Sequence, residues 1–592
     1  MSPLICRRSV PATHRFSAAI PPLLQRIYAA RELQQDAELS LAFSELHAPQ
    51  LLSGIDKAVS LLQVQLQQQG RVLIVSDFDA DGATSCTLAI RALRAFGFQH
   101  IDYIVPNRFE YGYGLTPEIV ALAQTREPHL LLTVDNGISS IEGVVAAQAL
   151  GMQVLITDHH LPGRELPAAD AIVNPNLPDC SFPSKSLAGV GVVFYLMIAL
   201  RARLRETGWF GQQGIAEPNL ADYLDLVALG TVADVVPLDR NNRILVNEGL
   251  RRIRAGRVCP GIDALLRLGK RSRETLVASD LGFAVAPRLN AAGRLDDMSL
   301  GIECLLAEHP EQAQAMAAEL DAMNQQRKEI ETDMREQAEA ELRSMQFEDS
   351  ELPAGLCLYQ ADWHQGVIGI LAARIKERTH RPVIAFADAG EDEQGVAQLK
   401  GSARSISGLH IRDALDTVAT RHPGLITRFG GHAMAAGLSL PREAYPPFSE
   451  AFASVVAEQL SADALQACLY TDGELQPAQL TLATAQMLRD AGPWGQHFPE
   501  PLFDGEFQVL QQRIVGGKHL KLVLSPVQAP QLAVDAIAFN VDSRDWEGCN
   551  NARVRLVYRL DINEFRGQRT LQLQVEHIER CINSVPETGL AH

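Results

Sequence analysis

The chain has 592 residues, of which 46% are hydrophobic and 21% are charged, a composition typical of globular proteins rather than disordered ones. Its formal net charge of -18 argues against a protein that coats nucleic acid indiscriminately, but a local basic groove would still permit an enzyme of nucleic acids. The nine cysteines are scattered and no apolar run reaches about 18 residues, so we expect a cytoplasmic protein without disulfides, zinc or membrane spans.

The first chemically informative stretch follows a mostly helical segment that we predict up to about residue 65. An apolar run at 72–75 predicts a buried strand, and Asp77, Asp79 and Asp81 follow it before a helix-like segment. Carboxylates at the carboxyl end of a strand lie where open α/β sheets bind ligands, and their mutual repulsion favours a bound cation. Taken alone, this turn is equally well explained as an Asp-rich helix cap.

Two more apolar runs end in similar residues. The run 130–134 ends at Asp135, and the run 154–157 is followed by Asp158, His159 and His160. Strands that alternate with helices and deliver acids or histidines at one end predict a doubly wound parallel sheet. Asp234 is a further candidate, because it lies in an otherwise apolar stretch and a buried carboxylate needs a partner such as a metal.

The middle of the chain contains a basic stretch and a long helix. Eight Arg and Lys residues between 251 and 273 either line a groove or form a solvated basic face. Residues 308–345 are predicted to form one helix, whose narrow apolar stripe is Met316, Leu320, Met323, Ile330 and Met334. We expect it to connect two globular parts. A coiled-coil dimer contact is the alternative, although the stripe is short and irregular for that role.

The last two parts differ in character. Apolar runs at 356–359 and 383–386 around a helix predict a second α/β domain, whereas short alternating runs from 469 to 578 predict a small all-β barrel. Its basic groups are candidate contacts to a single strand: Arg513, Lys518, His519, Lys521, Arg566 and Arg569. Its aromatic residues are predicted to be barrel core rather than stacking platforms: Phe503, Phe507, Phe539 and Tyr558.

Several segments together resemble a known superfamily. In order and spacing, four segments resemble the motifs of the DHH phosphoesterases: 77–82, 135–137, 158–160 and 233–234. Further matches are found at 106–108 with 112–115, 287–294, 363–369, 401–405 and 430–437. Within the superfamily the chain is similar to the single-stranded-DNA-specific exonucleases from about residue 70 to 440, and we expect the similarity to continue to the end.

The resemblance implies a domain organisation. We expect a DHH catalytic domain of class α/β with a doubly wound parallel sheet and an N-terminal helical extension at 1–305, and a connecting helix at 306–346. A second α/β domain of the DHHA1 type is expected at 347–461. The barrel at 462–592 is then expected to be an OB-fold that binds single strands.

We hypothesise a two-metal site for Mn²⁺ or Mg²⁺, because Asp and His side chains offer hard oxygen and borderline nitrogen ligands without thiolates. The expected metal residues are Asp77, Asp79, Asp81, Asp135, His159 and Asp234, with Asp77 acting either directly or through water. Asp81, Asp135 and His160 are the expected catalytic residues. His160 would bind the phosphate or protonate the leaving oxygen.

The resemblance also assigns substrate contacts. Arg108, Ser402 and Arg404 match positions associated with a terminal 5′ phosphate, for which guanidinium and hydroxyl groups are suitable donors. His432 is expected to bind the substrate phosphate beside the metals. Four further residues are expected along the path of the strand: Arg288, Asn290, Gln325 and Arg327.

The function that follows is a metal-dependent 5′→3′ exonuclease that degrades single-stranded DNA to mononucleotides in DNA repair and recombination. We expect a monomer that works with a helicase and a single-strand-binding protein. The alternatives are a DHH phosphodiesterase of short oligonucleotides, which would not require the barrel, and an inactive DNA-binding scaffold, which would be expected to lose acids or the His pair.

Overall fold

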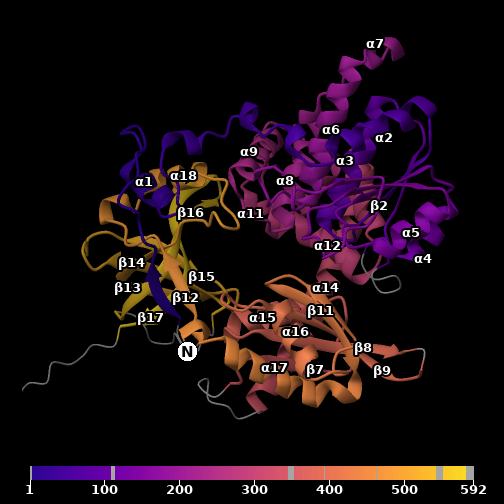
Figure 1. Cartoon of the computed structure of the whole chain (residues 1–592). Helices are drawn as coiled ribbons and strands as arrows, with labels where there is room; N and C mark the ends of the chain where they lie inside the picture. Colours follow the sequence, from indigo (N-terminus) through magenta and orange to yellow (C-terminus); the bar gives the residue numbers. More distant parts are fainter. Residues whose placement is uncertain are drawn as a thin grey trace, which may run out of the picture.

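The computed structural model describes residues 3–107, 114–344, 352–392, 394–461, 463–541 and 551–581. The chain forms two α/β parts and a β-barrel, which Figure 1 shows at the upper right, below and at the left. None of the helices in the described ranges combines the length and apolar character that a membrane crossing needs.

The first α/β part contains a parallel sheet. Its strand order is β3-β2-β4-β5-β6, and every neighbouring pair is parallel. From β2 the chain adds β3 on one side and β4 on the other, so the order reverses beside β2, where doubly wound sheets bind ligands. The predicted doubly wound sheet is therefore confirmed. Its strands are β2 (Val72–Ser76), β3 (Ile101–Ile104), β4 (Leu130–Val134), β5 (Gln153–Thr157) and β6 (Ala171–Val173).

Helices cover both faces of this sheet, because alternate residues of each strand point to opposite sides. Val72 and Ile74 pack towards α2, α3 and α6, whereas Leu73 and Val75 pack towards α4 and α5. Burial on both faces explains why the strands are continuous apolar runs. The helices are α2 (Ile55–Gln68), α3 (Ala80–Phe96), α4 (Pro117–Gln124), α5 (Ile141–Ala149) and α6 (Gly189–Glu206).

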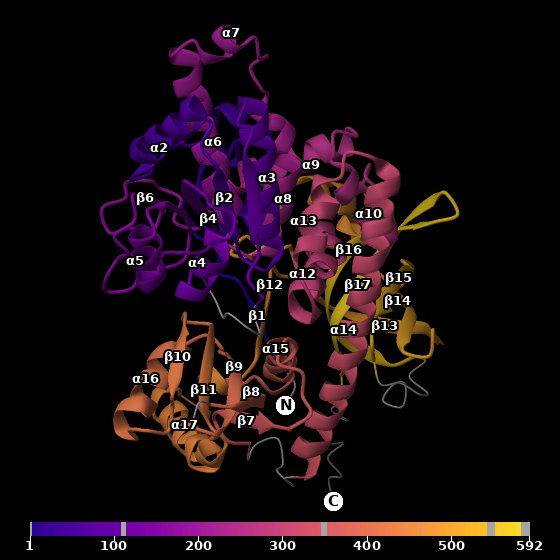
Figure 2. The same cartoon turned by 90° about the vertical axis from the view of Figure 1, so that its right-hand side faces the viewer.

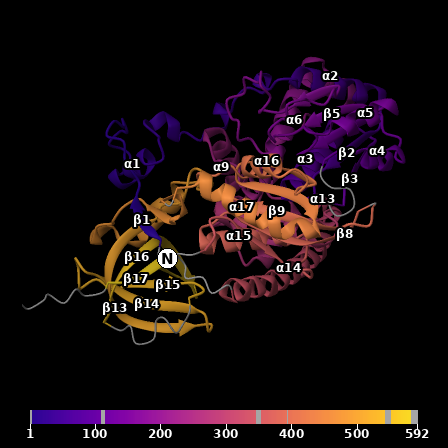
Figure 3. The same cartoon turned by 60° about the horizontal axis from the view of Figure 1, so that its bottom comes forward.

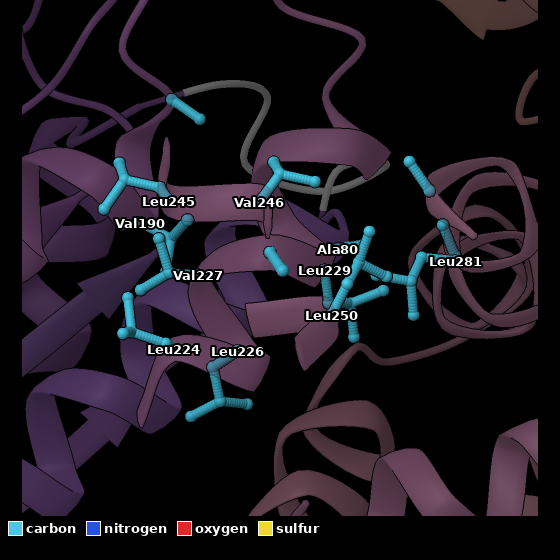
Figure 4. Packing of buried hydrophobic residues seen from close by; sticks show 14 of the residues in the cluster. Ala80, Val190, Leu224, Leu226, Val227, Leu229, Leu245, Val246, Leu250 and Leu281 are labelled. Atoms are coloured by element: carbon cyan, nitrogen blue, oxygen red, sulfur yellow. The ribbon is translucent and has the colours of Figure 1, made fainter. Parts of the chain in front are cut away.

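A helical layer follows and packs on α3 and α6. Figure 4 shows part of this core, in which leucines of α8 and α9 pack with Ala80 of α3, Val190 of α6 and Leu281. The elements are α7 (Trp209–Gln213), α8 (Leu224–Ala233), α9 (Arg240–Arg254), α10 (Pro260–Leu268), α11 (Ala278–Asp280), the π-helix η5 (Leu281–Val285), α12 (Ala286–Leu295) and α13 (Ser299–Leu306).

The predicted long helix is confirmed as α14 (Pro310–Ser344). It packs on α10, α12 and α13 of the first part and on α15 (Ile368–Thr379) of the second, and Figure 2 shows it running between them. All five residues of its predicted apolar stripe belong to the cores of these two parts. The stripe is therefore used within the chain, which argues against the coiled-coil alternative.

The second α/β part has a mixed sheet in the order β10-β11-β9-β8-β7, in which only the β7–β8 pair is parallel among the described strands. Two helices, α16 (Ile411–Arg421) and α17 (Tyr445–Gln459), complete its core together with α15. The strands are β7 (Leu356–Tyr359), β8 (Val383–Glu391), β9 (Ala397–Arg404), β10 (Arg428–Gly431) and β11 (Ala435–Pro441).

The predicted barrel is confirmed as a closed sheet in the order β13-β14-β15-β17-β16. Phe503, Phe507 and Tyr558 are buried in it as predicted, but the prediction is wrong for Phe539, which is 49% exposed. Phe539 follows the last residue of β15 and so lies at the rim. The elements are α18 (Leu482–Asp490), β13 (Phe503–Val515), β14 (His519–Pro526), β15 (Val534–Ala538), β16 (Arg553–Phe565) and β17 (Gln568–Arg580).

The N-terminal segment differs from the mostly helical prediction. Its first element is β1 (Leu4–Arg7), which pairs in parallel with β12 (Cys468–Thr471), and α1 (Pro22–Ala29) follows. A buried ion pair of 2.7 Å between Arg31 and Asp472 continues this contact. Figure 3 shows the N-terminus beside the barrel. The extension thus links the first α/β part to the barrel, which local sequence patterns could not reveal because the paired strands are far apart in sequence.

Candidate metal and phosphate site

The turn after β2 is fixed by hydrogen bonds and close backbone contacts that depend on the residues found there. Asp79 caps α3, and its Oδ1 accepts hydrogen bonds from the backbone N–H groups of Asp81 (2.9 Å) and Gly82 (3.0 Å). A methyl group at Gly82 would lie 2.4 Å from the Asp77 carbonyl oxygen, so only glycine allows this approach. Part of the helix-cap interpretation is therefore correct, but it accounts for Asp79 alone.

Asp81 is held by a second helix. Its carboxylate oxygens accept hydrogen bonds from the N–H groups of Gly189 (2.7 Å) and Val190 (3.0 Å) at the start of α6. The unpaired N–H groups and the dipole at a helix N-terminus stabilise a carboxylate there. The side chain is completely buried between α3 and α6, and Gly230 of α8 closes it from a third side. Asp81 thus has a fixed position.

Asp135 follows β4 in a strained backbone conformation. Its φ is 62°, in the left-handed region that few residues other than glycine adopt. A methyl group at Gly189 would lie 2.6 Å from Asp135 Oδ1, so α6 approaches this carboxylate as well. Strain of this kind persists where the surroundings enforce it, and it aims the buried carboxylate at the carboxyl ends of the strands.

Asp158 organises the histidine pair after β5. Its carboxylate accepts hydrogen bonds from the N–H groups of Ile138, His159 and His160, and Oδ1 lies 2.7 Å from His160 Nδ1. Burial opposes ionisation of Asp158, but the His160 side chain outweighs it and holds the pKa below its ordinary value. From sequence, Asp158 is a member of the 158–160 motif without a predicted role of its own. The signal that could have found its role was its position directly before two histidines.

All six predicted metal residues come together at this edge of the sheet. His159 Nε2 lies 3.1 Å from Asp135 Oδ1, 3.4 Å from Asp234 Oδ2 and 4.0 Å from Asp81 Oδ2. Asp234 reaches this point as the C-cap of α8. Three sets of donor atoms lie within 4.8 Å of one another: Asp77, Asp79 and Asp135; Asp81, His159 and Asp234; and Asp135, His159 and His160.

This donor set fits divalent cations. It consists of carboxylate oxygens and imidazole nitrogens, which suit Mn²⁺ or Mg²⁺. His159 Nε2 is buried and, within the described part of the chain, accepts or donates no hydrogen bond although three carboxylates surround it. Burial and the charge of His160 lower the pKa of His159, so its imidazole is neutral, as a metal ligand must be. Asp135 and His159 connect the first two sets, so that cations held by these two sets would be neighbours.

The carboxylates repel one another without a cation. Burial and the charge of Asp234 raise the pKa of Asp81 to about 7, whereas burial and the charge of Asp79 raise that of Asp234 to about 8. Burial and four neighbouring carboxylates raise the pKa of Asp135 well above its ordinary value. Such shifts mean that the cluster retains protons near neutral pH unless metal replaces them.

The second α/β part contributes to the same site. His432 lies in the turn between β10 and β11, and the centroids of its ring and the His160 ring are 5.8 Å apart. Gly431 makes this turn possible, because its φ is 144° and a methyl group there would lie 2.5 Å from the Ala435 carbonyl oxygen. Burial and the charge of His160 lower the pKa of His432. His432 thus lies beside His160 at the donor cluster, and its contact with the substrate phosphate stays a prediction.

Ser402 and Arg404 form a second polar cluster on β9. Arg404 Nη1 lies 3.1 Å from Ser402 Oγ. A methyl group at Gly369 would lie 2.8 Å from Arg404 Nη2 and 2.9 Å from Ser402 Oγ, so the first turn of α15 packs directly on both side chains. A guanidinium, a hydroxyl and a helix N-terminus at one point suit an anion such as a phosphate.

The remaining predicted substrate residues have other surroundings. Asn290 Oδ1 accepts a hydrogen bond of 2.8 Å from the Ala80 N–H and so supports the turn after β2. Arg288 is 8% exposed, and its Nε lies 2.8 Å from Asp321 Oδ1 of α14. Gln325 is exposed on α14, Arg327 is buried there and pairs with Glu331 at 2.7 Å, and Arg108 lies outside the described residues.

The basic stretch between 251 and 273 is largely neutralised. Most of its side chains pair with acids of neighbouring helices, as a solvated basic face would, and few remain for a groove. The ion-paired members are Arg251, Arg252, Arg267, Arg271 and Arg273.

Comparisons with known proteins agree with this geometry. Three family models match: the DHH family N-terminal domain over residues 71–231, the DHHA1 domain over 353–458 and the RecJ OB domain over 471–577. The single-stranded-DNA-specific exonuclease RecJ of Dickeya dadantii is 56% identical over 572 residues, which cover 97% of this chain and 98% of that protein.

Solved structures show the same architecture. RecJ of Thermus thermophilus in complex with Mn²⁺ matches with a TM-score of 0.76 and 28% identity, covering 95% of this chain and 76% of that chain. The same protein in complex with Mg²⁺ matches with a TM-score of 0.70 and 26% identity, covering 95% and 75% of the two chains.

The raised carboxyl pKa values predict how metal stabilisation depends on pH. Carboxyl groups whose pKa is higher in the folded state stabilise the metal-free protein fully below their unfolded pKa of about 3.9, and this contribution is lost as the pH rises through the folded values. Mn²⁺ should therefore raise the Tm more at about pH 8.5 than at about pH 6. Asp234→Asn should raise the Tm of the metal-free protein at the higher pH and remove most of the metal effect. Calorimetry with EDTA and with Mn²⁺ measures both. An equal rise in Tm on adding Mn²⁺ at the two pH values would contradict the assignment. So would a rise in Asp234→Asn as large as that in the wild-type protein.

Proposed function

The chain belongs to the RecJ family of single-stranded-DNA-specific exonucleases, and on this premise we propose that it degrades single-stranded DNA from the 5′ end, releasing mononucleotides. The observation that carries the proposal is the cluster of Asp81, Asp135, His159 and Asp234 faced by His432 of the second α/β part. We propose that it serves DNA repair and recombination.

The cofactor is proposed to be Mn²⁺ or Mg²⁺ at two adjacent positions. Asp77, Asp79 and Asp135 would hold one ion, and Asp81, His159 and Asp234 the other, with Asp135 between them. Bound there, the ions would make a water molecule more acidic and neutralise charge on the scissile phosphate. Asp77 lies within reach as a direct ligand. Asp79 and Asp81 also hold backbone N–H groups, which fixes their orientation for this role.

His160 and His432 are proposed to act on the phosphate. Burial lowers the pKa of His160, but the hydrogen bond with Asp158 outweighs it and raises the pKa to about 9, so the imidazole carries a proton at neutral pH. Since Nδ1 is engaged by Asp158, Nε2 is the nitrogen that donates to a phosphate oxygen or protonates the leaving oxygen. His432, with a lowered pKa, is neutral and provides a further donor.

Recognition of the 5′ end is proposed at Ser402 and Arg404, together with Arg108. The cluster of hydroxyl, guanidinium and helix N-terminus would bind the terminal phosphate, and a 5′ phosphate held there would set the polarity of digestion.

The barrel is proposed to hold the strand on the 3′ side of the site, before it is digested. The rings of His519 and Phe539 are 5.1 Å apart at its rim, and Lys518 is exposed in the neighbouring β13–β14 turn. Aromatic platforms flanked by basic groups bind single strands without base preference. We place the domain boundaries near residues 305, 346 and 461.

In the cell, a helicase and a single-strand-binding protein would supply the strand to a monomeric enzyme. We place it in the cytoplasm, because the eight cysteines within the described ranges are free thiols and reducing compartments preserve them.

Asp135→Asn tests the reaction. Asparagine tolerates the left-handed backbone of this position, so the fold should persist while one metal carboxylate is lost. With a single strand labelled at the 5′ end, Mn²⁺ and the wild-type protein, labelled mononucleotide should be the first product, and the variant should be slower by about 100-fold or more.

Glu142→Gln is the matched control, because Glu142 is an exposed acid in the first turn of α5 and belongs to none of the donor sets. Full activity of Asp135→Asn would contradict the metal assignment. Cleavage of a dinucleotide alone, or binding without cleavage, would contradict the exonuclease proposal.

Arg404→Ala tests the 5′-phosphate pocket. Charge-assisted hydrogen bonds to the phosphate should be lost, raising the KM for a 5′-phosphorylated strand by about 10- to 100-fold. The preference over a strand with a capped 5′ end should disappear in the variant. Arg421→Ala, at an exposed arginine of α16, is the control. Equal wild-type rates on phosphorylated and capped strands would argue against the pocket.

A further inference from the structure

The helix formed by η5 and α12 has one open face beside the metal cluster. Between Leu281 and Leu295 most residues are buried, and the side chains that are not, apart from the terminal leucine, are Phe283, Pro287, Asn290 and Arg294. Spacings of four, three and four residues place these side chains on one face of a helix.

Two members of this face have known surroundings. Asn290 accepts a hydrogen bond from Ala80 in the turn that carries the metal carboxylates. Arg294 Nη1 lies 3.4 Å from the Gly366 carbonyl oxygen, in the segment that leads into α15 and hence to Ser402 and Arg404. Along the helix axis the order is therefore the phosphate cluster near Arg294, the metal cluster near Asn290, and then Phe283.

Phe283 is unusual for an aromatic residue in a folded domain. It is 81% exposed, although it lies in a π-helix that packs on the core. Its neighbour Gly282 packs against Val232, where a methyl group would lie 3.2 Å from Val232 Cγ1, only two residues before Asp234. π-Helical turns are rare and are frequently found at functional sites. An exposed phenyl ring at this position indicates a surface that binds an apolar or aromatic group.

Two further exposed residues lie on segments that pack against η5. Val235, directly after the metal residue Asp234, is 63% exposed and has a φ of 59°, a strained conformation for a β-branched side chain. Lys270 is exposed, and its neighbour Gly269 packs against Ala284, where a methyl group would lie 2.9 Å from Ala284 Cβ. Exposed apolar groups and a cation thus come from adjacent segments, and a nucleotide offers matching groups in its base, sugar and phosphate.

We propose that Phe283 is a stacking platform for an unpaired base on the 3′ side of the scissile phosphate, with Val235 against a sugar and Lys270 near a phosphate. This inference rests on the proposed function. Phe283 and Asn290 are seven residues apart, which is about 10 Å along the axis and about three base steps at the B-form rise of 3.4 Å. The stacked base therefore lies within about three nucleotides of the reaction.

Stacking explains how the site can prefer single strands without reading their sequence. Every base has a π-face, so the platform accepts any base, but a base inside a duplex keeps its stacking neighbours and its partner. Only a strand whose bases are free can place one on Phe283 as its 5′ end reaches Ser402 and Arg404.

A fluorescent base locates the platform in the full-length protein. Single strands carry one 2-aminopurine at positions 1 to about 5 from a 5′ phosphate, a range that covers the three base steps derived above, and binding is measured in EDTA so that no cleavage occurs. We expect quenching at one or two adjacent positions. Phe283→Ala should remove it and weaken binding about tenfold. Phe283→Tyr should retain both, and so should Phe43→Ala, at an exposed phenylalanine of the N-terminal segment.

Cleavage gives a second, independent readout. With Mn²⁺, an abasic residue at the quenched position should slow the wild-type protein, whereas Phe283→Ala should degrade normal and abasic strands equally slowly. Unchanged quenching, affinity and rate in Phe283→Ala would overturn the platform alone. If the wild-type protein degraded no single strand, the proposed function itself would fail and the platform with it.

Discussion

The structure depends on carboxylates held closer together than their charges favour. Asp77, Asp79, Asp81, Asp135 and Asp234 converge beside β2 and β4, where the order of the sheet reverses. The fold resists their repulsion with the N-terminus of α6, the capped start of α3 and glycines that let backbones approach. The remaining repulsion appears as raised carboxyl pKa values, and divalent cations are the natural counterions. The repulsion destabilises the metal-free first α/β part, and the same carboxylates are the groups that can bind the cations.

The other two globular parts are proposed to add groups to the site that this cluster forms. Its carboxylates and His159 can hold metals, and among the described residues the pair Ser402 and Arg404 proposed for the 5′ phosphate lies in the second α/β part. The second α/β part supplies His432, which lies against His160, and the pair Ser402 and Arg404. Helix α14 packs on both α/β parts and connects them. The N-terminal strand pairs with β12 and links the first part to the barrel. The proposed metal site lies in the first part, and the second part and the barrel would add contacts to the strand.

Much of the site could be predicted from sequence because its signals are local. Apolar runs that end in acids predicted the strands before Asp77, Asp135 and Asp158, and an acid in apolar surroundings predicted Asp234. The motif order then connected them. What local patterns could not show were contacts over long distances in sequence: the pairing of β1 with β12, the ion pair of Arg288 with Asp321, and the support that Asn290 gives to Ala80. The exposure of Phe539 and Phe283 likewise depends on where strands and helices end in space.

The central claim is that the carboxylates and His159 form two adjacent cation positions connected by Asp135. Anomalous diffraction at the manganese absorption edge, from crystals of the full-length protein grown with Mn²⁺, tests it most directly. We predict two peaks at the carboxyl end of the sheet, one among Asp77, Asp79 and Asp135 and the other among Asp81, His159 and Asp234. Peaks elsewhere on the protein, with none between these side chains at saturating Mn²⁺, would contradict the account.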